Sequence, residues 1–178
     1  MFHSNTELLI DYWRRLAGGD KAPSRGQIDP AGFASLLPQT FVAERVAPGQ
    51  YPFRLAGEFI IDLHGRSLRG DNLLSLWSRS HRIELQTALE SVLRSPGPLV
   101  VSAEGRTDDG TALRVEVLFL PLAGPTGAAD RFLGLYQPTS ATSALHGRPV
   151  RELLIRTVGG GEIMPRLRLA ALDGRRIA

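Results

Sequence analysis

Apolar residues recur at helical spacing near the start of the chain, with polar residues between them. This period predicts an amphipathic helix, which Ser4 and Glu7 begin as a capping box and Gly18–Gly19 end. Five apolar side chains would share one face of this helix: Leu8, Leu9, Tyr12, Trp13 and Leu16. Because such a stripe rarely stays exposed, it either covers the open face of a sheet or pairs with its copy in a second subunit.

A second, longer amphipathic helix is predicted in the middle of the chain. It begins at Ser78 or Ser80, and Pro96–Gly97 end it. Its predicted buried face consists of Leu85, Ala88, Leu89, Val92 and Leu93. Charged and polar residues occupy the positions between them, which is typical of a helix that covers a core with one side.

Five segments have the composition and alternation of β-strands, and turn residues separate them. They comprise residues 40–46, 53–56, 99–104, 113–119 and 131–137. Residues 107–111 form a predicted hairpin turn around Gly110, and residues 121–130 a loop. Residues 151–158 can add a further short strand, which the glycines at 159–161 would break.

Short helical pieces fill the stretches around the first hairpin. One begins at Pro30, with Asp29 as its cap, and ends at Pro38. Residues 59–63 form another, and a helical turn ends on Trp77. The order is therefore helix, two strands, short helices, long helix and three strands. Antiparallel hairpins at both ends and a helical connection between them predict an α+β fold.

Composition limits the classes of protein to consider. The chain has 178 residues, 43% hydrophobic and 22% charged, which suits one globular domain with a sizeable core. It has no cysteine, and this excludes disulfides, Cys-ligated metal sites and cysteinyl-flavin photochemistry. The N-terminus lacks the pattern of a signal peptide, and no apolar run approaches the roughly 18 residues of a membrane span. We therefore expect a cytoplasmic protein with no membrane partner.

The net charge of +3 is unevenly distributed along the chain. Residues 1–145 hold 14 basic residues against 15 acidic ones, whereas residues 146–178 hold seven arginines against three acids. A basic tail can contact nucleic acid. Its arginines are dispersed and lack interleaved aromatic residues, so we interpret it as a solvated tail and do not expect a nucleic-acid partner.

Glycine-punctuated motifs in the middle of the chain carry a resemblance to a known family. They are the strand end Arg54-Leu55-Ala56-Gly57, the corner Gly65-Arg66, then Gly70 and Trp77, with Arg25 and Asp29-Pro30 upstream. With this spacing and order of elements, the chain resembles the PAS domain, and more narrowly a bacterial family of small stand-alone PAS proteins. The resemblance implies an α+β fold with a five-stranded antiparallel sheet and helices on one face.

Two segments lie outside such a PAS-like unit. We therefore predict three parts: an N-terminal helix and lead-in segment at 1–38, a PAS-like domain at 39–138, and an arginine-rich C-terminal extension at 139–178. The first contributes an extra N-terminal helix, and the last a basic C-terminal tail.

A PAS-like fold implies a ligand pocket between the concave face of the sheet and the short helices. The predicted apolar wall and roof consist of Leu99, Val101, Val115, Val117, Leu63, Leu73 and Trp77. Trp77 has a second interpretation, as an aromatic anchor that packs helix against sheet. The sequence does not name the ligand or any cofactor.

Two arginines are the charged candidates for ligand binding. Arg54 and Arg66 lie within the motif region, and a guanidinium suits a carboxylate or phosphate. The favoured alternative is an internal salt bridge with one of the nearby acids, Glu58, Asp62 or Asp71.

Catalytic and metal sites have weaker support. Ser67, His64 and Asp62 lie too close in sequence to form a triad, and His64 is interpreted as a turn residue. His81 lies on the helix that carries the axial ligand in haem-binding PAS domains, but its polar surroundings at the helix start favour a surface histidine. Asp108–Asp109 suit a turn better than a metal. We predict no catalytic and no metal-binding residue.

The leading hypothesis is a non-enzymatic sensory or signalling domain that binds a small-molecule ligand, a signalling protein partner or both. Its output would be a change in homodimerisation or partner binding. The alternative is a protein-interaction adaptor whose own side chains fill the pocket. A small α+β enzyme and a nucleic-acid binder that uses the basic tail are further alternatives.

Overall fold

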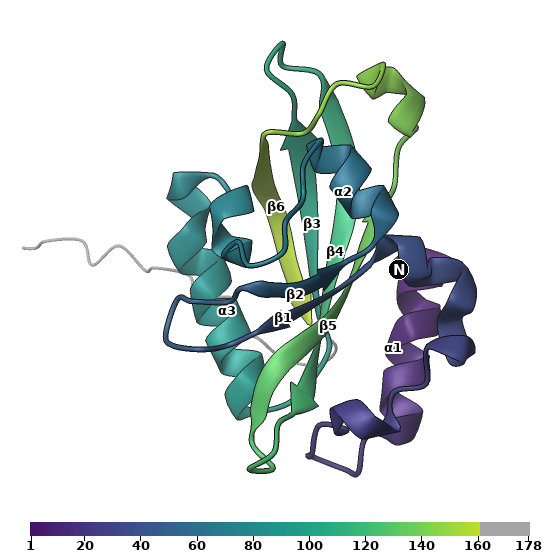
Figure 1. Cartoon of the computed structure of the whole chain (residues 1–178), viewed down its shortest axis with the longest axis vertical. Helices are drawn as coiled ribbons and strands as arrows, with labels where there is room; N and C mark the ends of the chain where they lie inside the picture. The colour runs from purple at the N-terminus through teal and green to yellow at the C-terminus, as the bar shows by residue number, and fades with distance from the viewer. Residues whose placement is uncertain (161–178) are drawn as a thin grey trace, which may run out of the picture.

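One six-stranded antiparallel sheet organises the chain. The computed structural model describes residues 1–160, and the strand order is β2-β1-β5-β4-β3-β6 (Figure 1). The strands are β1 (Thr40–Glu44), β2 (Phe53–Ala56), β3 (Leu99–Arg106), β4 (Ala112–Ala123), β5 (Ala129–Pro138) and β6 (Glu152–Gly160). The α-helices are α1 (Ser4–Leu16), α2 (Glu58–His64) and α3 (Arg82–Arg94). Four of the 3-10 segments are η2 (Pro30–Gln39), η3 (Leu73–Leu76), η4 (Arg79–His81) and η5 (Thr142–Leu145).

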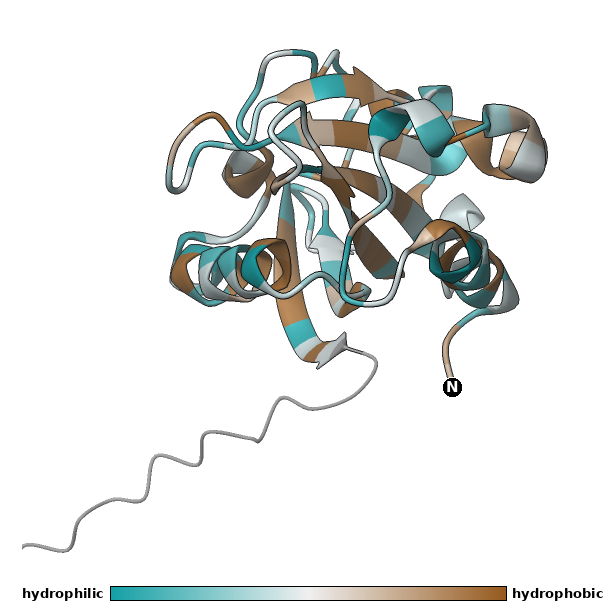
Figure 2. Cartoon of the chain, turned by 90° about the horizontal axis from the view of Figure 1, so that it is seen from below, coloured by the Kyte–Doolittle hydropathy of each residue, from teal (hydrophilic) through white to brown (hydrophobic). Residues whose placement is uncertain are grey.

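Both faces of the sheet are covered, by different elements. Alternate side chains of a strand point to opposite faces, so β4 sends Val115, Val117 and Phe119 to one core and Leu118 and Leu120 to the other. We call the face under α2, η3 and α3 the inner face, and the face under α1 and η2 the outer face. The hydropathy colouring shows the apolar strands between these helices (Figure 2).

Helix α1 packs on the outer face, which confirms the first of its two predicted roles. Leu9 and Trp13 lie in the same cluster as the outward-facing leucines of β4 and β5. The predicted stripe is wrong at one position, because Leu8 is 47% exposed and Ile10 is buried instead. Ile10 lies one position after Leu9 on the side of the helix that faces the sheet, whereas Leu8 points away from it.

The start of α1 differs from the predicted capping box. His3 is the cap, and its Nδ1 accepts a hydrogen bond from the Asn5 N–H at 3.2 Å. Glu116 on β4, 9% exposed, accepts from the backbone N–H of His3 at 3.0 Å and from the Thr6 hydroxyl at 2.7 Å. A buried carboxylate on the sheet therefore fixes the first turn of α1, a partner that local sequence does not contain.

The strands of the second half of the chain are longer than the alternation indicated. β4 extends to Ala123 and β5 begins at Ala129, so only residues 124–128 connect them, rather than the predicted loop 121–130. β1 ends at Glu44, two residues earlier than predicted. The α+β fold with an additional N-terminal helix is confirmed. The sheet has six strands rather than the predicted five, because residues 152–160 form β6, the additional strand that the sequence allowed. It pairs with β3 through Gly159 and Gly160, so the predicted break at these glycines is wrong.

The short helical segments lie close to their predicted positions. The Asp29 side chain caps η2 by accepting from the Ala31 N–H at 3.0 Å. The long helix α3 begins at Arg82, later than predicted, because the 3-10 turn η4 follows Ser78 first. In the part of the chain that the structure describes, no helix is both long and apolar enough to cross a bilayer.

Candidate functional site

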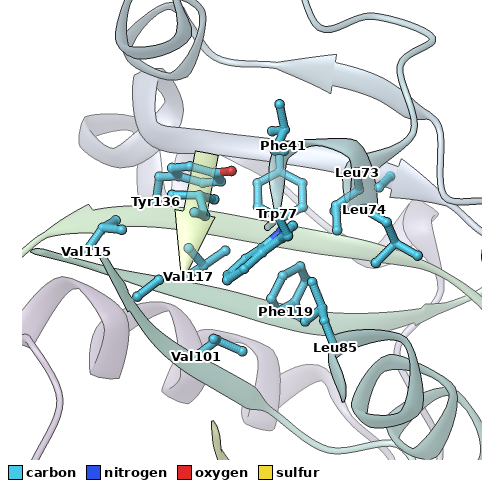
Figure 3. Packing of buried hydrophobic residues seen from close by; sticks show 14 of the residues in the cluster. Phe41, Leu73, Leu74, Trp77, Leu85, Val101, Val115, Val117, Phe119 and Tyr136 are labelled. Carbon is cyan, nitrogen blue, oxygen red and sulfur yellow. The ribbon is translucent and has the colours of Figure 1, made fainter. Parts of the chain in front are cut away.

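The predicted pocket residues of the inner face converge in one core. Their side chains come from α2, η3 and the residue that follows it, β3 and β4: Leu63, Leu73, Trp77, Leu99, Val101, Val115 and Val117. Each is buried, and Trp77 lies at the centre, with Phe41, Phe119 and Val117 around it (Figure 3). The structure thus brings the predicted apolar wall and roof together. Their role in ligand binding stays a prediction.

Aromatic side chains that the sequence analysis did not assign fill much of this core. The Phe41 ring contacts Phe53, Phe119 and Tyr136 edge to face, at centroid distances of 5.5, 5.7 and 5.8 Å. Gly134 on β5 makes room for it, because a Cβ there would lie 1.9 Å from the Phe41 ring. The inner face is therefore a packed aromatic core rather than an open cup.

Two polar atoms in this core have no hydrogen-bond partner among the described residues. They are Trp77 Nε1 and His64 Nε2, on side chains that are 1% and 3% exposed. Most buried polar groups in proteins are paired, and an unpaired one costs about 1–3 kcal/mol. The two atoms lie at the ends of η3 and α2, the segments that cover the inner face.

The chemistry of His64 is fixed by its surroundings. Its Nδ1 lies 3.0 Å from the Val150 carbonyl oxygen and donates to it, which leaves Nε2 as an acceptor. Burial, and to a lesser degree the nearby Arg66, lower the pKa of His64 to about 4, although the Val150 carbonyl opposes the shift. The imidazole is therefore neutral near pH 7. The prediction that His64 is a turn residue is wrong; it is the last residue of α2, four positions after buried Ile60.

Tyr136 adds a third polar side chain to the same region. It lies on β5, is 1% exposed, and its ring is 5.9 Å from that of His64. Burial raises the pKa of Tyr136, so the phenol stays protonated. The signal in the sequence was its alternation with Phe132 and Gly134 on one side of the strand, which was not assigned to a face.

The segments that carry His64 and Trp77 are bonded directly to β6 and to the residues just before it. The Val150 N–H donates to the Leu63 carbonyl at 2.8 Å, beside the His64–Val150 bond. The Ser78 N–H donates to the Leu153 carbonyl at 2.9 Å. A movement of α2, which carries His64, or of η3, which precedes Trp77, would therefore change the hydrogen bonds of β6 or of the residues just before it.

The two predicted arginines lie apart from this core. Arg66 pairs with Asp71, as the favoured alternative predicted. Arg54 pairs with Glu44 at 2.7 Å, an acid outside the three that were considered. Both arginine side chains are about half exposed. Glu44 follows from strand pairing, because β1 and β2 are neighbours in the sheet.

The remaining candidates for chemistry have structural roles. His81 is half-buried against β6, and its Nδ1 accepts from the Ile155 N–H at 3.4 Å, so it is not the surface histidine that was predicted. Asp109 accepts from Thr107 and Thr111 in the hairpin turn, as predicted for a turn residue, and these bonds lower its pKa to about 2. Within residues 1–160 no three His, Cys, Asp or Glu side chains are grouped as metal ligands would be.

Three arginines of the basic C-terminal segment are engaged in ion pairs. Arg148 and Arg151 each lie 2.8 Å from a hairpin aspartate, Asp109 and Asp108 respectively. Arg156 pairs with Glu104. The other four arginines of that segment, at 166, 168, 175 and 176, lie outside the described residues. The prediction of a solvated tail and the domain boundaries at 38/39 and 138/139 stay predictions.

Three surface cavities lie outside the aromatic core. One of about 210 Å³ lies beside α1, and one of about 550 Å³ lies between the end of α3 and the β4–β5 turn. The third, of about 520 Å³, lies beside β1 and β2. Of the predicted pocket residues, only Arg54 lines any of the three.

Comparison with known proteins places this arrangement in a family. A family model described as PAS domain matches residues 1–137. No curated protein sequence matches the chain. Among solved structures, a LOV protein of Rhodobacter sphaeroides is 16% identical, with a TM-score of 0.48, covering 66% of this chain and 72% of its own. The PAS domain of the fruit-fly ELK potassium channel is 12% identical, with a TM-score of 0.48, covering 62% of this chain and 94% of its own.

Proposed function

The chain belongs to the PAS domain family, a sensory signalling fold, and on that premise we propose that it binds a small neutral ligand beneath α2 and η3. One observation carries the proposal: His64 Nε2 and Trp77 Nε1 are buried in the inner core without partners. A ligand that pairs with both atoms would remove a cost of about 1–3 kcal/mol for each.

The two atoms define the chemistry of the ligand. Neutral His64 offers a lone pair at Nε2, and Trp77 offers an N–H, so the ligand carries both a donor and an acceptor, as a hydroxyl or amide does. The surrounding side chains are aromatic and aliphatic, and an unpaired charge among them would be costly. The ligand is therefore small, uncharged and largely apolar.

We propose that ligand binding changes the position of β6. The His64 and Trp77 segments are bonded to Val150 and Leu153, so a ligand that moves α2 or η3 alters the start of this edge strand. An edge strand can pair with a second chain wherever its own chain does not cover it, and on β6 residues 77–81 cover the positions around Leu153 and Ile155. We propose that the response is a change in homodimerisation or in binding of a signalling protein, without catalysis.

The packed aromatic core favours a second candidate, an adaptor with no ligand. Fully buried aromatic and leucine side chains of the inner core occupy the space that a ligand would need, among them Phe41, Phe53, Phe119, Phe132, Tyr136, Leu73 and Leu76. An adaptor of this kind would signal through partner binding alone.

Native mass spectrometry of the purified protein, with a UV–visible spectrum of the same sample, separates the two candidates. A sensor is expected to carry an extra mass that disappears on denaturation. Trp77→Phe, which removes one of the two polar atoms, should lower the fraction of loaded protein. Trp13→Phe is the matched control on the outer face and should leave that fraction unchanged.

A bare chain in the wild-type sample, together with no difference between the two variants, would favour the adaptor. Hydrogen exchange gives a second readout of the sensor. The Val150 amide proton bonds to Leu63 and the Ser78 amide proton bonds to Leu153, so the exchange of both should differ between loaded and stripped protein. Equal exchange in the two samples would contradict the proposed route through β6.

A further inference from the structure

The outer face has a recess at its β1–β2 end with an unusual concentration of arginine. Four guanidinium groups line this cavity of about 520 Å³, from four separate parts of the chain: Arg25, Arg54, Arg69 and Arg131. Glu44 is the acid in its lining. Its volume lies within the range of about 300–1,000 Å³ that is typical of small-molecule sites.

Charges in the recess do not balance. Glu44 lies 2.7 Å from Arg54 and 3.7 Å from Arg131, so two arginines share one carboxylate. Arg131 also pairs with Asp130 at 2.8 Å. Arg25 and Arg69 are exposed and have no ionic partner among residues 1–160. Four arginines against Glu44 and Asp130 leave a net charge of +2.

Ion pairs hold two of the four arginines of the recess in place, and the other two have none within the described part of the chain. The Arg131 side chain is only 15% exposed and is fixed between two acids, and Arg54 is fixed by Glu44. These pairs pre-organise one side of the recess, which lowers the ordering cost of binding. Arg25 and Arg69 border the opposite margins, from the lead-in segment and from the loop beside β2, and are free to close on an anion.

The recess also has an apolar part. Val42 on β1 pairs with Leu55 on β2, and both line the cavity. Leu55 is 52% exposed, one of few large apolar side chains of the described chain that face solvent. A ligand with an anionic group and an apolar or planar portion would contact both kinds of surface.

We propose that this recess binds a small organic diphosphate, with the charged group between Arg25, Arg69 and the Arg54–Arg131 side, and the organic portion over Leu55. Guanidinium groups bind phosphoryl oxygens in pairs of parallel hydrogen bonds, and several of them suit a group with several negative charges. Neither His64 nor Trp77 lines the recess, so the test of this site does not depend on the ligand proposed beneath α2 and η3.

Titration calorimetry with inorganic pyrophosphate, ADP and inorganic phosphate tests the proposal on the whole chain. ADP is expected to bind more tightly than pyrophosphate because it also contacts Leu55, and phosphate more weakly than either. The double variant R25Q/R69Q should weaken ADP binding by about tenfold or more, corresponding to about 1.4 kcal/mol. Both residues are exposed, so the fold should be retained.

R15Q/R79Q is the matched control, because it removes the same charge from two exposed arginines outside the recess. ADP binding that is unchanged in this control and lost in R25Q/R69Q would support the site. Equal weakening in both variants, or no binding of ADP or pyrophosphate to the wild type, would overturn it. Tighter binding of a polyglutamate peptide than of ADP, abolished by R25Q/R69Q, would assign the recess to acidic peptides and overturn the diphosphate.

Discussion

The two tryptophans of the chain lie on opposite faces of the sheet and differ in the hydrogen bonding of their indole N–H groups. Trp13 on the outer face is 4% exposed, and its Nε1–H donates to the Pro121 carbonyl at 2.8 Å. Trp77 on the inner face is 1% exposed, and its Nε1–H has no partner among the described residues. Because both indoles are equally buried, the contrast concerns hydrogen bonding rather than burial.

This contrast extends to the faces themselves. On the outer face, polar groups of α1 form hydrogen bonds with the sheet: Trp13 bonds to Pro121, and Thr6 bonds to Glu116. On the inner face, polar atoms of Trp77 and His64 are left over. Gln39 Oε1, at the end of η2, is a third buried atom without a partner in residues 1–160, so the contrast holds for the contact with α1 rather than for the whole outer face. An unsatisfied donor and an unsatisfied acceptor in one core leave the inner face able to bind another molecule.

The largest effect is expected from emptying the centre of the inner face. Trp77→Ala should lower the free energy of unfolding by about 3–5 kcal/mol, because it removes a large side chain from a packed core. Urea unfolding followed by Trp13 fluorescence measures this loss. Leu37→Ala is the control, since Leu37 is 39% exposed and its loss should change stability by less than about 0.5 kcal/mol. Similar small effects of both variants would show that the inner face is loosely packed.

A smaller effect is expected from the protonation of His64. Its pKa is about 4 in the folded chain and 6.5 without the fold, so the unfolded chain holds the proton more tightly between these values. The stabilisation is complete above pH 6.5 and is lost as the pH falls to about 4. The full loss is about 3 kcal/mol.

Urea unfolding of the wild type and of His64→Gln at pH 7 and pH 4.5 measures this contribution. Carboxylates such as Glu90 and Glu104, whose pKa values are lowered by arginine partners, titrate in both proteins and cancel in the comparison. The wild type should lose more stability than the variant between the two pH values. Parallel losses would show that His64 is solvated in the folded chain.

The smallest effect isolates the hydrogen bond that distinguishes the two indoles. Trp13→Phe and Trp77→Phe remove the same atoms, but only the first leaves a carbonyl, that of Pro121, without its donor. In protein stripped of ligand, Trp13→Phe should therefore cost about 1 kcal/mol more than Trp77→Phe. Chemical unfolding of both variants gives the difference. A larger cost for Trp77→Phe would mean that its N–H is already paired.

Several elements were predictable because their signals are local. The face of α3 that carries Leu85 and Leu89 follows from helical period. The hairpin turn follows from Gly110, a residue type that tolerates the φ of +82° found there. The apolar wall of Val101, Val115 and Val117 follows from strand alternation. These patterns need only the positions of neighbouring residues in the chain.

Partners distant in sequence were not predictable in the same way. Glu116 fixes α1 across 110 residues through Thr6, and Val150 orients His64 across 86 residues. The arginine recess likewise joins Arg25 to Arg131, which no spacing in the sequence relates. These contacts depend on which strands are neighbours in the sheet.

Local patterns in the sequence were enough to predict the α+β class, the family resemblance, most helices and strands, and the residues of the inner apolar wall. Hydrophobic period and turn chemistry act over a few residues, so they can be recognised in one chain. The folded chain was needed to show that α1 covers the outer face, that β6 completes the sheet, and that His64 and Trp77 keep unpaired atoms. Those outcomes depend on packing and hydrogen bonds between segments that only the folded sheet brings together.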